Sequence, residues 1–219
     1  MKKIKAIINF VVVFFIYLLL NTLLASLFQN DLNSTSKLLS TTSYITIYLL
    51  SLTIFIFIFA NKFIKDFYHI KKEDIKIGFK YWILGITIMV ISNIILMILL
   101  GDTTANENSN RLIIKNNLPF AIFAMSIYAP IVEESVFRLN LRNVFKNKYF
   151  YALMSGLLFG SLHLIDEFIN LTNPLYLFYL IPYGIMGFVF ALAYYETDNI
   201  FSSIIFHSIH NSLAILLLV

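Results

Sequence analysis

The chain has 219 residues, of which 59% are hydrophobic and only 13% are charged. A soluble domain typically carries about 25% charged residues, so this composition indicates an integral membrane protein. Sixteen Lys and Arg residues against twelve Asp and Glu residues give a formal charge of +4, but no basic stripe interleaved with aromatic residues predicts a nucleic-acid partner. The chain has no cysteine, which excludes disulfides, thiolate metal sites and a cysteine nucleophile.

Seven apolar stretches are long enough to cross a membrane as helices. A helix needs about 20 mainly apolar residues to span ~30 Å of hydrocarbon. The first stretch is longer than the apolar part of a signal peptide, so we expect it to be a retained helix. The sequence therefore predicts an all-α, polytopic transmembrane bundle, with spans at 6–28, 39–60, 80–100, 118–138, 150–166, 175–195 and 200–219.

The basic residues between these spans predict the orientation, because cytoplasmic loops are enriched in Lys and Arg. The N-terminal tail and the connections 61–80 and 138–148 together hold thirteen Lys and Arg residues, against three on the other side. The N-terminus is therefore predicted to be cytoplasmic. The Lys-, Asn- and Ile-rich composition is typical of AT-rich bacterial genomes and indicates a bacterial plasma membrane.

Two connections are informative in themselves. The segment 61–80 mixes six Lys residues with apolar positions, which predicts a short interfacial helix. The segment 101–117 is rich in Asn, Thr and Ser, which predicts an exposed loop. We expect one integral membrane domain, in which 1–117 supplies the N-terminal helices and 118–219 forms the core, with the site cavity among the last four spans.

An adjacent pair of acids, Glu133 and Glu134, interrupts the fourth apolar stretch. An acid at mid-membrane costs roughly 2.5–3.5 kcal/mol on the most lenient scale, so such residues are rare unless they pair or take part in function. Arg138 is four residues after Glu134 and can pair with it, while Glu133 points about 100 degrees away. Pro130, one turn earlier, weakens the local backbone hydrogen bonding. Glu133 is therefore predicted to be free to face a cavity.

Two further polar clusters lie in later apolar stretches. Gly156 and Gly160 have the small-xxx-small spacing that lets another helix approach closely, and His163 follows them. In the last stretch, His207 and Asn211 share a helix face. A buried Glu and a His can activate water for hydrolysis, and His and Asn side chains can bind an oxyanion. Two His and a Glu can also hold a catalytic zinc ion.

These residues resemble three motifs of one family. The sequence EESVFR resembles EExxxR, FGSLH resembles FxxxH, and HSIHN resembles HxxxN, the motifs of the CPBP intramembrane proteases. This family, also called Abi, includes CAAX-type prenyl-protein endopeptidases and bacteriocin-processing or immunity proteins. The resemblance covers about residues 118–219, and all three motifs occur in the family's order.

The resemblance implies a role for each matching position. Glu133 would be the base that activates water, with His163 as its partner, and Glu134 with Arg138 would support the site. The resemblance thus implies an intramembrane endopeptidase that hydrolyses a peptide bond in a membrane-associated peptide or protein, with membrane lipids as its surroundings.

The last helix has two readings within the same resemblance. His207 with Asn211 would stabilise the oxyanion; on a metal-dependent reading, Glu133, His163 and His207 would be ligands of a metal such as zinc. His210 lies outside the motif and is a candidate supporting residue. Both mechanisms stay open on the sequence.

The depth of the site can be estimated from helix rise. Glu133 lies roughly 8–10 Å and His207 roughly 10 Å from the cytoplasmic end of their helices. His163 would reach a similar depth if 142–152 formed an interfacial helix and the span began near Leu153. We therefore expect a water-filled cavity that opens to the cytoplasmic half of the membrane.

Two other classes of function compete with a protease. One is a non-enzymatic bacteriocin-immunity or scaffolding protein, in which the polar residues form a structural ion-pair network. The other is a proton-coupled transporter, since buried Glu and His residues form proton relays. No repeated halves of the kind that transporters show are visible in the sequence, so the transporter ranks last.

Overall fold

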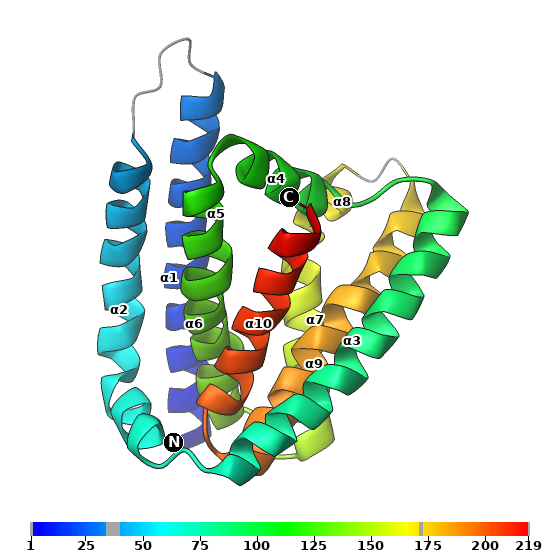
Figure 1. Cartoon of the computed structure of the whole chain (residues 1–219). Coiled ribbons are helices and arrows are strands. Elements are labelled where there is room, and N and C mark those ends of the chain that lie inside the picture. Colours follow the sequence, from blue (N-terminus) through cyan, green and yellow to red (C-terminus); the bar gives the residue numbers. More distant parts are fainter. Residues whose placement is uncertain (1, 34–39, 171–172, 219) are drawn as a thin grey trace.

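The computed structural model of this chain is a bundle of helices joined by short connections (Figure 1). It describes residues 2–33, 40–170 and 173–218. These ranges contain no strand, and the all-α prediction is confirmed. In chain order the elements are α1 (Lys2–Asn33), α2 (Thr41–Tyr68), α3 (Lys72–Leu100), α4 (Ala105–Asn116), α5 (Leu118–Phe123), η1 (Ala124–Tyr128), α6 (Ala129–Glu134), η2 (Ser135–Asn140), η3 (Leu141–Asn143), α7 (Lys148–Leu162), α8 (Ile165–Ile169), η4 (Pro174–Tyr179), α9 (Leu180–Thr197) and α10 (Phe201–Leu218).

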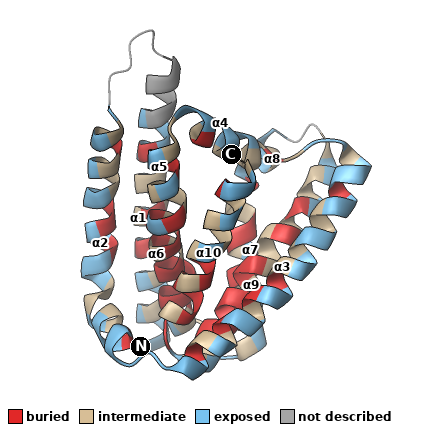
Figure 2. Ribbon diagram, in the orientation of Figure 1, coloured by how far each residue is buried: buried red, intermediate tan, exposed pale blue. Residues whose placement is uncertain are grey.

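Six helical segments in the described ranges are long and apolar enough to cross a membrane. Their outer faces carry large apolar side chains such as Phe57, which is 84% exposed, and Ile98, which is 79% exposed. Figure 2 shows exposed residues along the outside of α1, α2 and α3, with buried residues concentrated around α6, α7 and α9. A surface of this kind suits lipid hydrocarbon rather than water. The chain is therefore a polytopic membrane protein.

The predicted span that is not among these six, 150–166, corresponds to α7, which has 15 residues. At 1.5 Å per residue it is about 22 Å long, shorter than a full hydrocarbon crossing. It still links the two ends of the bundle, because Lys148 pairs with Glu196 at one end and His163 stacks on Tyr183 near the other. The prediction of seven long spans thus holds for six, and α7 is not among them.

Three predicted connections differ from the structure. The segment 61–80 is not a separate interfacial helix, because α2 continues to Tyr68 and α3 begins at Lys72. The segment 142–152 is not one either, since η3 ends at Asn143 and α7 starts at Lys148, capped by the Asn147 side chain. In the first place the polar residues extend the long helices α2 and α3 beyond their apolar parts, and in the second, residues 144–147 form a non-helical connection; single-sequence patterns do not distinguish either case from a new helix.

The predicted loop 101–117 contains the helix α4. The Thr104 side chain accepts a hydrogen bond from the Glu107 backbone N–H and so caps the helix, and Glu107 pairs with Arg111 one turn later. The sequence Thr-x-x-Glu is a helix-start signal that outweighs the polar composition of the segment. The loop prediction was therefore wrong, and α4 lies across one end of the bundle (Figure 1).

The glycines of α7 allow close contact with α9. A Cβ atom added to Gly156 would lie 2.6 Å from the backbone oxygen of Gly184, and one added to Gly160 would lie 2.8 Å from the Leu180 side chain. Such backbone proximity is what small-xxx-small spacing permits in membranes. The close contact fixes the end of α7, and hence His163, against α9.

We predict that Gly156→Ala destabilises the protein, because a methyl group has no room against the α9 backbone. Overpacking of this kind costs typically about 1–3 kcal/mol, which unfolding in detergent micelles would measure. Gly184→Ala is the matched control, since its Cβ would lie 3.4 Å from the Gly156 oxygen, an ordinary contact. Equal stability of the two variants would contradict the close packing described here.

Candidate active site

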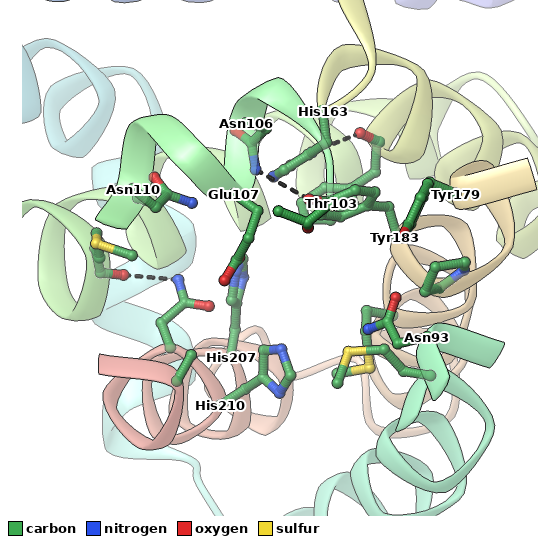
Figure 3. A pocket seen from close by; sticks show the side chains of 18 of the residues that line it. Asn93, Thr103, Asn106, Glu107, Asn110, His163, Tyr179, Tyr183, His207 and His210 are labelled. Atoms are coloured by element: carbon green, nitrogen blue, oxygen red, sulfur yellow. Dashed lines mark hydrogen bonds between the residues drawn. The ribbon is translucent and has the colours of Figure 1, made fainter. Parts of the chain in front are cut away.

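A cavity of about 480 Å³ lies inside the bundle, between α3, α4, α6, α7, α9 and α10. Figure 3 shows side chains from these elements pointing into it. Four of the residues singled out from the sequence line it together with the candidate supporting residue His210. These four are Glu133, His163, His207 and Asn211. The three polar clusters of the sequence therefore meet at one space.

Glu133 and Glu134 lie at the end of α6, between two π-helical segments, η1 and η2. The Ala129 N–H bonds the Ala124 carbonyl, and Pro130 has no N–H to offer the next carbonyl, that of Met125. The Asn211 side-chain amide donates to this Met125 carbonyl at 2.7 Å. The irregular backbone that Pro130 predicts is thus satisfied by α10, as membrane proteins require, and Asn211 is fixed at the cavity wall.

Glu134 and Arg138 form the predicted ion pair, with Arg138 Nε 2.8 Å from Glu134 Oε2. Both side chains are 0% exposed. The guanidinium also lies over the rings of Phe159 and Phe190, at 5.0 and 5.8 Å from their centroids. A buried charge of this kind is tolerated because it has both a carboxylate and aromatic faces beside it. Glu134 is therefore occupied and does not line the cavity.

His207 connects the two glutamates. Its Nδ1 donates to Glu134 Oε1 at 2.8 Å, and its Nε2 lies 3.7 Å from Glu133 Oε2. The ring is stacked on Phe190 and is only 3% exposed. Because the Nδ1 hydrogen bond fixes the ring, Nε2 is the nitrogen directed at Glu133. A chain of contacts thus runs from Arg138 through Glu134 and His207 to Glu133.

His163 occupies the C-terminal end of α7. Its Nδ1 donates to the Phe159 carbonyl at 2.8 Å, and its ring stacks on Tyr183 at 5.0 Å between centroids. With Nδ1 as donor, Nε2 of the neutral ring is an acceptor. Among the described residues no hydrogen bond or ion pair joins His163 to Glu133; the acid's neighbour is His207. The predicted pair shares the cavity without direct contact.

Sequence reasoning missed part of the cavity wall. Asn93 on α3 and Asn106 and Asn110 on α4 line the cavity, as do Thr103 and Tyr183 (Figure 3). Asn93 is a lone amide within an apolar stretch, and the cost of a polar group in hydrocarbon could have identified it. Asn106 and Asn110 are four residues apart on α4, a spacing hidden by the loop prediction. The cavity is therefore not confined to the last four spans.

The cavity runs toward α4 rather than toward the lysine-rich connections. Its residues extend from Glu133 and Phe190 to Thr103 and Arg111, and α10 contributes residues as far as Leu218. His207 is six residues from the start of α10, which agrees with the expected depth of roughly 10 Å from that end. The cavity was expected to open at the end of the bundle where α10 begins. This expectation is wrong, because bulky side chains such as Phe206 and Trp82 fill the bundle between His207 and that end.

The proposed metal ligands do not form a metal site in this structure. Within the part of the chain that the structure describes, no group of three or more His or acidic side chains is placed to hold an ion. Nδ1 of His163 is engaged with a backbone carbonyl, and Nδ1 of His207 with Glu134. These Nδ1 contacts leave Nε2 of each ring free, as in histidines that bind zinc, so a metal role for Glu133, His163 and His207 stays a prediction.

Comparison with known proteins agrees with the motifs. Residues 115–213 match the sequence model of the type II CAAX prenyl endopeptidase Rce1-like family. These residues, less than half of the chain, are thus similar to this family. The matched range includes Glu133, Glu134, Arg138, His163, His207 and Asn211.

Two curated bacterial proteins are similar to this chain. The UPF0177 protein YvdC of Lactococcus lactis subsp. lactis (strain IL1403) is 30% identical over 178 residues, which cover 74% of this chain and 64% of YvdC. The membrane-embedded CAAX protease MroQ of Staphylococcus aureus (strain USA300) is 30% identical over 159 residues, which cover 66% of this chain and 60% of MroQ. The chain thus matches less than two thirds of either relative. No solved structure matches it.

We predict that Glu134→Ala destabilises the protein strongly, because Arg138 would be left buried without its carboxylate. Breaking a buried pair by removing one partner costs about 3–5 kcal/mol, measurable as a change in the free energy of unfolding in detergent. Glu107→Ala, which breaks the exposed pair with Arg111, should cost less than about 1 kcal/mol.

A second variant separates pairing from packing. In Glu134→Gln/Arg138→Met no charge remains unpaired, so we expect part of the stability lost in Glu134→Ala to return. A double variant no more stable than Glu134→Ala would show that the charge pair is not what the site depends on.

Proposed function

We propose that this chain is an intramembrane endopeptidase that hydrolyses a peptide bond with a water molecule activated by Glu133. The observation that carries the proposal is the difference in burial and partners between Glu133 and Glu134. Glu134 is fully buried against Arg138 and His207, while Glu133 lines the cavity and, among the described residues, has only the His207 ring within ion-pair distance. The similarity of residues 115–213 to a CAAX endopeptidase family, and of the chain to MroQ, supports a protease over the other classes.

The proposed reaction needs no covalent intermediate with the protein. Water enters the cavity and transfers a proton to the Glu133 carboxylate as its oxygen attacks the carbonyl carbon of the peptide. The C–N bond of the resulting tetrahedral intermediate then breaks, and the amine leaves with the proton from Glu133. The products are a carboxylic acid and an amine.

His163 and Asn211 would assist at opposite sides of the cavity. Nε2 of His163 is an acceptor toward the cavity and can hold the attacking water by a hydrogen bond. Asn211 uses its amide group to bond the Met125 carbonyl, and the second N–H of that amide can donate to the oxyanion. His207, held by Glu134 through Nδ1, would orient Glu133 and complete the oxyanion site only with a second proton on Nε2.

We expect Glu133→Gln to abolish cleavage while the protein still folds, because the amide is isosteric but cannot accept the proton. Loss of a general base lowers the rate by about 10²–10⁴-fold. The measurement is cleavage of a peptide library by purified protein in detergent, analysed by mass spectrometry, with His163→Ala expected to show a comparable loss.

His69→Ala is the matched control, because His69 is an exposed histidine at the end of α2 whose ring bonds only the Lys65 carbonyl. It should cleave as the parent does. Retained cleavage in Glu133→Gln would overturn the mechanism. If the parent cleaves nothing, while the biological effect of the chain survives Glu133→Gln, a non-enzymatic immunity or scaffolding role would replace the proposal.

We also expect cleavage to persist when divalent metals are removed. The reason is that, among the residues described, no group of three His or acidic side chains is placed to hold an ion. The measurement combines elemental analysis of the purified protein with activity after treatment with a chelator. Stoichiometric zinc, together with loss of cleavage on chelation and recovery on zinc addition, would establish the metal-dependent alternative.

A further inference from the structure

The cavity is closed at the end of the bundle where α10 begins, next to His207; we call this the closed end. There Phe206 packs on Trp82 and Phe79, with ring centroids 5.9 and 6.0 Å apart. Phe206 also lies against Gly78, where any added side chain would collide with it. These contacts join α3 to α10 tightly at this level, so a peptide cannot enter between them from below.

A polar network ties the chain together beyond this aromatic layer. The Asp66 carboxylate accepts from the Ile200 N–H at 2.8 Å and pairs with Lys62 at 3.0 Å. The Asn199 side chain donates to the Asp66 carbonyl at 2.9 Å. The end of α2 is thereby fastened to the α9–α10 connection, which seals the same end of the bundle.

The opposite end is where the cavity meets its surroundings. Arg111 on α4 is half exposed and Leu217 on α10 is 86% exposed, yet both border the cavity. From His207 to Leu218, α10 rises by 11 residues, or about 16 Å. Glu133 thus lies closer to the closed end, but it is reached from the α4 end.

The basic residues are distributed very unequally between these two ends. Of those that the structure describes, Arg111 and Lys115 are the two at the α4 end. At the closed end, where the N-terminus, the α2–α3 turn and the start of α7 meet (Figure 1), there are twelve. These are Lys2, Lys3, Lys5, Lys62, Lys65, Lys71, Lys72, Lys76, Lys80, Arg142, Lys146 and Lys148.

We infer that the cavity opens on the extracytoplasmic face of the membrane. Lys- and Arg-rich connections stay in the cytoplasm, and here they mark the closed end. Even without the three N-terminal lysines, the excess at that end remains large. Together with the proposed function, on which this step rests, the orientation assigns the substrate class. The substrate is a peptide segment at the outer surface or in the outer half of the bilayer, rather than a cytoplasmic protein terminus.

Single-cysteine variants test this orientation directly, since the chain has no cysteine of its own. Asn108→Cys lies on the exposed face of α4 and Asn110→Cys at the cavity, whereas Lys72→Cys and Lys146→Cys are exposed at the closed end. A membrane-impermeant maleimide applied to intact bacterial cells should label the two α4 variants as fully as in permeabilised cells. The two closed-end variants should not be labelled in intact cells and should be labelled once the cells are permeabilised.

The opposite pattern, with Lys72→Cys and Lys146→Cys labelled in intact cells, would overturn the inference. Labelling does not depend on catalysis, so this result stands even if Glu133→Gln retains cleavage and the proposed function fails. The substrate assignment has its own readout: right-side-out membrane vesicles should cleave an added impermeant peptide library, and inside-out vesicles should not. Cleavage by inside-out vesicles alone would contradict it.

Discussion

The buried contact between Arg138 and Glu134 is the interaction on which the site depends. Neither charge would be stable in the bundle without the other, and the second oxygen of Glu134 is what holds His207 in place. The two aromatic rings beside the guanidinium come from α7 and α9. One ion pair therefore links five elements of the bundle, α6, η2, α7, α9 and α10, and Glu133 is left unpaired with Arg138 because its neighbour Glu134 is fully engaged.

Much of this arrangement follows from the sequence by simple physics. The cost of charge in hydrocarbon identified the acidic pair, and helix periodicity assigned Arg138 to Glu134 rather than to Glu133. The consequence of Pro130 was also foreseeable as a weakened backbone. The hydrogen bond that satisfies this backbone comes from the Asn211 side chain, 86 residues away. It could not be foreseen, because it depends on how α10 packs against η1.

The failures of prediction have physical causes of their own. Helix boundaries at the membrane surface are set by caps and pairings such as those of Thr104 and Asn147, which composition overlooks. The direction of the cavity was missed for another reason. Depth along one helix is readable from residue count, but the side on which water enters depends on which residues of other helices, Phe206 and Trp82 here, fill the space beyond the site.

The cavity wall has a mixed origin in the chain. The part of the wall that contains Glu133 and His207 lies inside the range 115–213 that matches the family model. Asn93, Asn106 and Asn110 lie before this range in the sequence. On the proposed function, the reacting groups and this part of the wall around the peptide therefore lie in separate stretches of sequence. A substitution at Asn93, Asn106 or Asn110 would then change which peptides fit the cavity and leave Glu133 and His207 as they are.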